Sequence, residues 1–161
     1  MTKDINTIKK ERLFYTKNTL SSTLCYLAIL ANVLYFVSIY SSDVGNYYYN
    51  IIIGASVVYN LLFLLFSFLC SEGVKGYSKM YSVVISVIGL LQIGRIFYIP
   101  MTAHNTVISL AGVETIVMDD SQFIYVVICL ALSAAFCVAA GIVGYVKACM
   151  LESYKKEFGI G

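Results

Sequence analysis

Four apolar stretches, each about 20 residues long, are the feature of this sequence that most limits its fold. A helix needs about 20 mostly apolar residues to cross the hydrocarbon core of a bilayer, because each residue adds about 1.5 Å. The stretches cover residues 20–40, 50–70, 80–100 and 123–146, and Arg95 is the one charged residue within them. We therefore predict an all-α membrane protein, built as a bundle of four transmembrane helices.

The composition favours a membrane over water. Apolar residues make up 60% of the 161 residues and charged residues 12%, whereas an average soluble domain has roughly 45–50% and about 25%. A soluble chain of this length has too much surface to bury so much hydrocarbon. We predict one membrane domain over residues 1–161, with a basic segment at 1–19, an outer loop at 101–122 and a tail at 147–161.

The basic residues predict how the chain is oriented. Lys and Arg gather in the short loops that face the cytoplasm. All of them except Arg95 lie in residues 1–19, 71–79 and 147–161, which four spans would bring to one side. The two loops on the other side contain Asp and Glu but neither Lys nor Arg. We expect a multi-pass protein of the cell membrane with both termini in the cytoplasm.

The two outer loops differ in length and character. The first, around Asp43 to Asn46, is short and predicts a tight turn. In the second, two β-branched runs, 106–110 and 113–117, flank Ala111-Gly112, a pattern that favours a small β-hairpin. An interfacial helix is the alternative. Because the loop is partly apolar, we expect it to cover the mouth of the bundle, lie on the membrane surface or contact a partner.

Three amide side chains lie near the middle of three stretches, at similar depth. They are Asn32, Asn60 and Gln92, and each shares a helical face with small or polar residues. We therefore expect the three to face the interior of the bundle and to meet there. Interhelical hydrogen bonds that fix the packing are the simpler interpretation. A path for a substrate or an ion is the other.

Arg95 is the residue most expected to have a function. It lies five residues before Pro100, about 7.5 Å along a helix axis, so its side chain can extend to the outer head groups. Pairing with Asp43, Asp119 or Asp120 is a second structural interpretation. A third is a charge that binds an anion or pairs with a partner protein. The candidate intramembrane polar site therefore has four members: Arg95, Gln92, Asn60 and Asn32.

The fourth stretch has two faces of small residues. Such residues at four-residue spacing let helix backbones approach closely. One face serves the interior of a four-helix bundle, so a second one predicts contact with another subunit or another copy. The second face is formed by Ala131, Ala135 and Ala139. The first, our candidate packing or assembly face, is formed by Ser133, Cys137, Gly141 and Gly144.

The sequence contains no recognisable reaction motif. Its five cysteines form no CxxC pair, and the single histidine, His104, lies in an outer loop. No phosphate-binding loop, metal-ligand spacing or nucleophile–base motif is found, so we expect no catalytic residue, no cofactor and no bound metal. Nucleic acid is not an expected partner.

We expect a non-enzymatic subunit of a larger membrane complex, such as an accessory or structural component of a transporter. Its partners would be membrane lipids and either other membrane subunits or further copies of the chain. The alternative is an oligomeric channel or small-molecule transporter with a polar path through Arg95, Gln92, Asn60 and Asn32.

Overall fold

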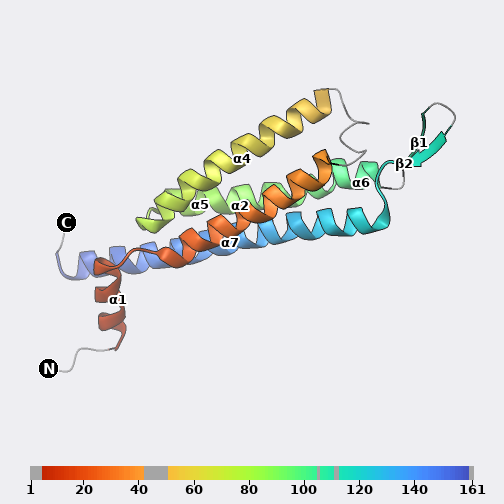
Figure 1. Ribbon diagram of the computed structural model, residues 1–161. Coiled ribbons are helices and arrows are strands. Elements are labelled where there is room, and N and C mark those ends of the chain that lie inside the picture. Colours follow the sequence, from red (N-terminus) through yellow and green to blue (C-terminus); the bar gives the residue numbers. More distant parts are fainter. Residues whose placement is uncertain (1–4, 42–50, 105, 111–112, 160–161) are drawn as a thin grey trace.

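Four long helices lie side by side as one bundle in the structure, a computed structural model that describes residues 5–41, 51–104, 106–110 and 113–159 (Figure 1). Each is long and apolar enough to cross a membrane, which confirms the prediction of four candidate spans and of a multi-pass membrane protein. The four are α2 (Thr19–Tyr40), α4 (Ile51–Lys75), α5 (Lys79–Ile96) and α7 (Asp120–Glu157), and the third candidate span continues beyond α5 to Ala103.

The third apolar stretch is not one continuous helix. The helix α5 ends at Ile96, and a short helix, α6 (Ile99–Ala103), follows it. Pro100 stands in the first turn of α6. A proline has no N–H to donate to the carbonyl group four residues earlier, here that of Ile96, so the chain breaks and restarts there.

The helix α7 is much longer than the apolar stretch from which it was predicted. Its 38 residues extend over about 57 Å, against roughly 30 Å for the hydrocarbon core. Asp119 caps its beginning by accepting a hydrogen bond of 2.9 Å from the backbone N–H of Gln122. Its last turn carries Lys155 and Lys156, whose charges suit the negative end of a helix dipole.

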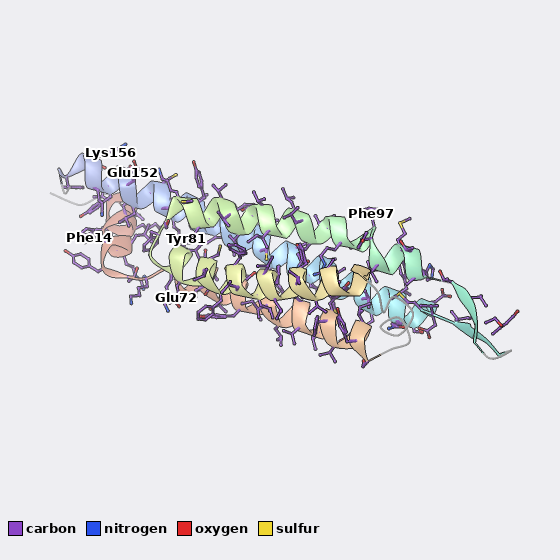
Figure 2. All side chains as sticks on the ribbon, turned by 90° about the horizontal axis from the view of Figure 1, so that it is seen from above. Phe14, Glu72, Tyr81, Phe97, Glu152 and Lys156 are labelled. Atoms are coloured by element: carbon purple, nitrogen blue, oxygen red, sulfur yellow. The ribbon has the colours of Figure 1, made fainter. Side chains whose placement is uncertain are left out.

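The N-terminal helix and the end of α7 lie together at one end of the bundle. Helix α1 (Ile5–Tyr15) is turned away from the bundle axis (Figure 1), and Lys10 Nζ donates a hydrogen bond of 3.2 Å to Ser153 Oγ. Figure 2 shows Phe14 near Glu152 at this end and Phe97 toward the other. The start of α5 joins the same group, because Lys79 pairs with Glu152.

Asn18 ties three segments together at this end. Its backbone N–H donates to the carbonyl of Lys75 over 3.1 Å, which links the start of α2 to the end of α4. Its side-chain oxygen caps α2 and accepts a hydrogen bond of 3.0 Å from Lys147 Nζ on α7. With 1% of its surface exposed, Asn18 is a buried polar junction.

Two short strands project from the opposite end of the bundle (Figure 1). Strand β1 (Val107–Leu110) pairs antiparallel with β2 (Val113–Ile116), with Val107 opposite Ile116. The turn expected at residues 111–112 and the turn expected around residues 43–46 lie outside the described residues, so the hairpin as a whole stays a prediction. After β2 the chain returns to the bundle, where Val117 and Met118 are buried.

Helices α5 and α7 pack with their backbones in close approach. A Cβ atom added to Gly89 would lie 2.9 Å from Cys137 Cβ, and one added to Gly141 would lie 2.6 Å from the backbone oxygen of Ser82. Gly144 meets the same turn of α5, where an added Cβ would lie 2.6 Å from Ser82 Oγ.

The candidate face of Ser133, Cys137, Gly141 and Gly144 is therefore buried within the chain. It serves helix packing in this bundle and is not open to another subunit. The second face differs, since Ala131 and Ala135 on α7 are exposed.

We predict that Gly141→Ala lowers the free energy of unfolding by about 1–3 kcal/mol, because the Ser82 backbone cannot move out of the way of a new methyl group. Gly54→Ala is the matched control, since no atom lies within 4 Å of its added Cβ. The control should be neutral or gain up to about 1 kcal/mol in helix propensity. Unfolding in mixed micelles measures both. Equal effects of the two changes would disprove the close α5–α7 contact.

Candidate functional site

The four residues of the predicted polar site meet in one hydrogen-bonded network. Asn32 Oδ1 accepts hydrogen bonds of 3.0 Å from Gln92 Nε2 and 3.0 Å from Arg95 Nη1. Asn32 Nδ2 donates to Asn60 Oδ1 over 3.3 Å, and Arg95 Nη1 also donates to Gln92 Oε1 over 3.0 Å. Helices α2, α4 and α5 therefore share a single polar contact inside the bundle.

Ser133 brings α7 into the same network. Its Oγ donates to the backbone oxygen of Ala28 over 3.0 Å and lies 3.4 Å from Gln92 Nε2. Asn60 Nδ2 donates back to the carbonyl of Ser56, one turn earlier on α4. Asn32, Gln92 and Ser133 are 0% exposed. Every candidate span thus contributes to a buried cluster whose amides bond mainly to one another.

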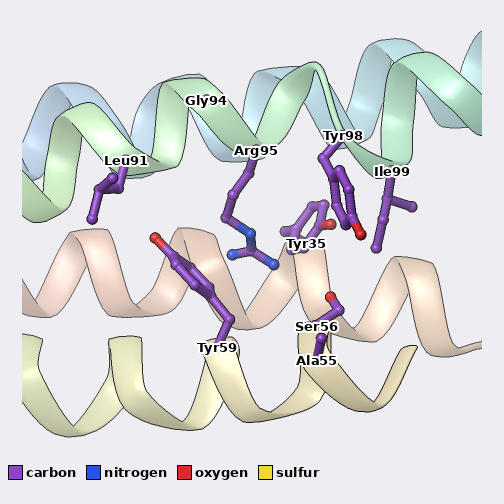
Figure 3. A pocket seen from close by; sticks show the side chains of 9 residues that line it. All are labelled: Tyr35, Ala55, Ser56, Tyr59, Leu91, Gly94, Arg95, Tyr98 and Ile99. Carbon is purple, nitrogen blue, oxygen red and sulfur yellow. The ribbon is translucent and has the colours of Figure 1, made fainter. Parts of the chain in front are cut away.

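Arg95 extends into the bundle between two aromatic rings (Figure 3). Its guanidinium carbon lies 4.6 Å from the ring centroid of Tyr35 and 4.5 Å from that of Tyr59. A cation over such a face gains about 0.5–1 kcal/mol, and about 2 or more where water is excluded. The prediction that Arg95 reaches outward to the head groups is therefore wrong.

Two of the three acidic residues expected to pair with Arg95 have other partners. Asp119 caps α7, and Asp120 Oδ1 lies 2.8 Å from Nε2 of His104. Within the described ranges, no carboxylate forms an ion pair with Arg95. The third candidate, Asp43, lies outside the described residues.

The charge of Arg95 is surrounded by dipoles and ring faces. Nη1 makes both hydrogen bonds, while Nη2 is buried and has no hydrogen-bond partner among the residues that the structure describes. An arginine at the centre of a membrane helix costs about 2.5–3.5 kcal/mol or more. The amide oxygens and the two rings offset part of that cost, but they bring no negative charge.

A pocket of about 420 Å³ opens beside Arg95, between α4 and α5. Tyr35, Tyr59 and Tyr98 line it together with Ser56, and Gly94 leaves one wall without a side chain (Figure 3). Its volume falls in the range of about 300–1,000 Å³ that is usual for ligand sites. One guanidinium among phenol groups suits the binding of an anionic group.

The tyrosines of the site were not predicted from the sequence. Tyrosines are common at membrane interfaces, so the sequence alone does not distinguish a tyrosine that has a different role. Tyr35 stands three residues after Asn32, and Tyr59 directly precedes Asn60. Helical spacing places Tyr35 on the polar face of its own helix. It does not predict that Tyr35 contacts a side chain of another helix, α5.

The described residues form no group of three His, Cys, Asp or Glu side chains that is able to hold a metal ion. Comparison of the chain with protein-family models, with curated proteins and with solved structures finds no match. The four candidate spans define the class, a multi-pass membrane protein. The function must therefore be argued from the site.

We predict that Gln92→Leu lowers the free energy of unfolding by about 1–2 kcal/mol, because it removes two interhelical hydrogen bonds, worth roughly 0.6 kcal/mol each, and the hydrogen bond from Arg95 on the same helix. Gln122→Leu, which removes one hydrogen bond to the carbonyl of Ser38, is the matched control. It should lower the same quantity by less than half as much. If both variants unfold alike, the polar cluster does not hold the helices together.

Proposed function

We propose that this protein is a non-enzymatic integral membrane subunit that receives an anionic group of a neighbouring membrane component in the pocket beside Arg95. One observation carries the proposal: a guanidinium is held inside the bundle, at an open pocket, and no carboxylate of the described residues pairs with it. An accessory or structural component of a transporter is the setting we favour for such a subunit.

Coulomb energy supports an external anion. Two opposite charges 4 Å apart attract each other by about 4 kcal/mol at an effective dielectric constant of about 20. Asn32 and Gln92 hold the guanidinium of Arg95 through Nη1, while Nη2 is buried and has no acceptor among the described residues. The orientation of the guanidinium is therefore fixed, and an anion that enters the pocket reaches Nη2 after the groups that cover this atom move aside.

The alternative is an oligomeric channel or transporter with a path through Arg95, Gln92, Asn60 and Asn32, and its support is weaker. The amides of Asn32, Asn60 and Gln92 bond to one another, to Arg95, to Ser133 or to backbone, and none is more than 1% exposed. Groups used in this way stabilise helix contacts. The exposed part of the cluster is at Arg95, which favours binding at the side of the bundle over passage through it.

We also propose that both termini face the cytoplasm. The basic helix α1 and the basic last turn of α7 lie at one end of the bundle, in agreement with the bias of Lys and Arg toward the cytoplasm. The Arg95 pocket then lies in the half of the bundle that is farther from the cytoplasm.

We predict that Arg95→Gln abolishes the recovery of a bound component when cross-linked membranes are solubilised in mild detergent, whereas Arg95→Lys retains part of it. Lys75→Gln is the control, because Lys75 carries an exposed charge that pairs with Glu72. Native mass spectrometry identifies what is bound. A wild-type protein that elutes as a bare monomer contradicts the proposal. The proposal is also contradicted if Asp43→Asn lowers the recovery of the bound component as much as Arg95→Gln does. Asp43 of the same chain would then be the negative partner of Arg95.

The orientation can be tested by cysteine labelling. Ser109→Cys, on an exposed position of β1, should react with a membrane-impermeant maleimide in intact cells. Lys155→Cys should react only after the cells are permeabilised, since it lies at the other end of the bundle. Native Cys149 is first changed to Ser, because it is partly exposed. The reverse labelling pattern would contradict the proposed orientation.

A further inference from the structure

We infer that the anionic group is the phosphate head group of a bilayer phospholipid, one of whose acyl chains lies in an apolar groove between α4 and α5. The inference rests on the proposed function, since it names the neighbour that Arg95 receives. It is carried by the position of a second hollow next to the Arg95 pocket.

The second hollow has a volume of about 310 Å³ and adjoins the Arg95 pocket, because Tyr59 and Leu91 line both. Apart from the Tyr59 hydroxyl, its lining is hydrocarbon. The further lining residues are Leu62, Phe63, Phe66, Val84 and Ile88. The seam between α4 and α5 thus has a cationic end and an apolar end, as an anionic amphiphile requires.

The two hollows follow one another along α5. At 1.5 Å per residue, Val84 lies about 16 Å along α5 from Arg95. Arg95 stands in the last turn of α5, and the groove runs from Leu91 toward the beginning of the helix. An acyl chain of a lipid whose phosphate lies at Arg95 would therefore follow the groove along α5.

The width of the groove favours an acyl chain over a partner helix. From Val84 to Leu91 the groove follows about 10 Å of α5, and its volume of about 310 Å³ is far less than a helix of that length occupies. A helix with its side chains is about 10–12 Å wide. A soluble anion, in turn, would leave the groove unused.

The head-group end carries one positive charge, since Arg95 lines the pocket. Its Nη2 is buried and has no partner among the described residues, so it can donate to a phosphate once the groups that cover it move aside. Tyr59 and Tyr98 line the same pocket (Figure 3). Guanidinium groups bind phosphate through charge-assisted hydrogen bonds, which are about twice as strong as neutral ones.

The test uses the full chain in nanodiscs of phosphatidylcholine, with and without phosphatidylglycerol of the same acyl chains. Native mass spectrometry measures which lipid stays bound. We expect one retained phosphatidylglycerol in the wild type. Arg95→Gln should lower its retention about tenfold or more, and Arg95→Lys less, because lysine keeps the charge but not the planar donor pair. Arg95→Lys keeps the test valid if Arg95→Gln does not fold.

A matched pair of phenylalanine substitutions tests the groove. Val84→Phe fills it, whereas Val87→Phe adds the same bulk on the α5 surface that faces a different hollow, near Gly141. We expect Val84→Phe to lower phosphatidylglycerol retention about tenfold and Val87→Phe to leave it unchanged. Binding of glycerol 3-phosphate, which has no acyl chain, should be far weaker and should not respond to Val84→Phe.

Equal retention of both lipids, or no effect of Val84→Phe, would overturn the inference. So would glycerol 3-phosphate that binds as tightly as the lipid, because the site would then serve a soluble anion. If instead a protein neighbour is cross-linked in an Arg95-dependent way while lipid retention does not depend on Arg95, the inference fails and the proposed function stands. If nothing bound depends on Arg95, both fail.

Discussion

The structure depends on how one positive charge is accommodated inside a bundle of apolar helices. Arg95 cannot be deprotonated in a protein, so its charge must be surrounded by oxygen atoms, ring faces or an anion. Asn32 and Gln92 supply the oxygens, and Tyr35 and Tyr59 supply the faces. These residues come from three helices, so the contacts that surround the charge also pack the helices of the bundle together.

The close α5–α7 contact makes this arrangement specific. Small residues on α7 let α5 approach until Gln92 is within 3.4 Å of Ser133 Oγ. Association in lipid has no hydrophobic driving force between helices, so backbone proximity and polar contacts must supply it. Helix α4 meets α5 across bulkier residues and leaves the hollows at Arg95 and along the seam. The close contact of α5 with α7 positions the charge of Arg95, and the hollows between α4 and α5 expose it.

Much of this could be predicted from the sequence, for definite reasons. Hydropathy identifies spans because lipid tolerates few charged residues, and equal depth with a shared polar face brings Asn32, Asn60 and Gln92 together. The direction of the Arg95 side chain could not be predicted, because it depends on rings contributed by α2 and α4. The break at Phe97–Tyr98 was missed because hydropathy does not register that Pro100 lacks an N–H. The role of α7 as an internal packing helix required knowing which small face meets α5.

The most direct test is the distance between the Arg95 guanidinium and phosphorus. The chain contains two arginines, so in an Arg12→Lys variant every ¹⁵N-guanidinium signal comes from Arg95. In bilayers that contain phosphatidylglycerol, ¹⁵N–³¹P dipolar recoupling should give a nitrogen–phosphorus distance of about 4 Å, because the N···O distance to a phosphate oxygen is about 2.8 Å and the P–O bond adds about 1.5 Å at an angle. An Arg95 signal that phosphorus leaves unaffected would contradict the account.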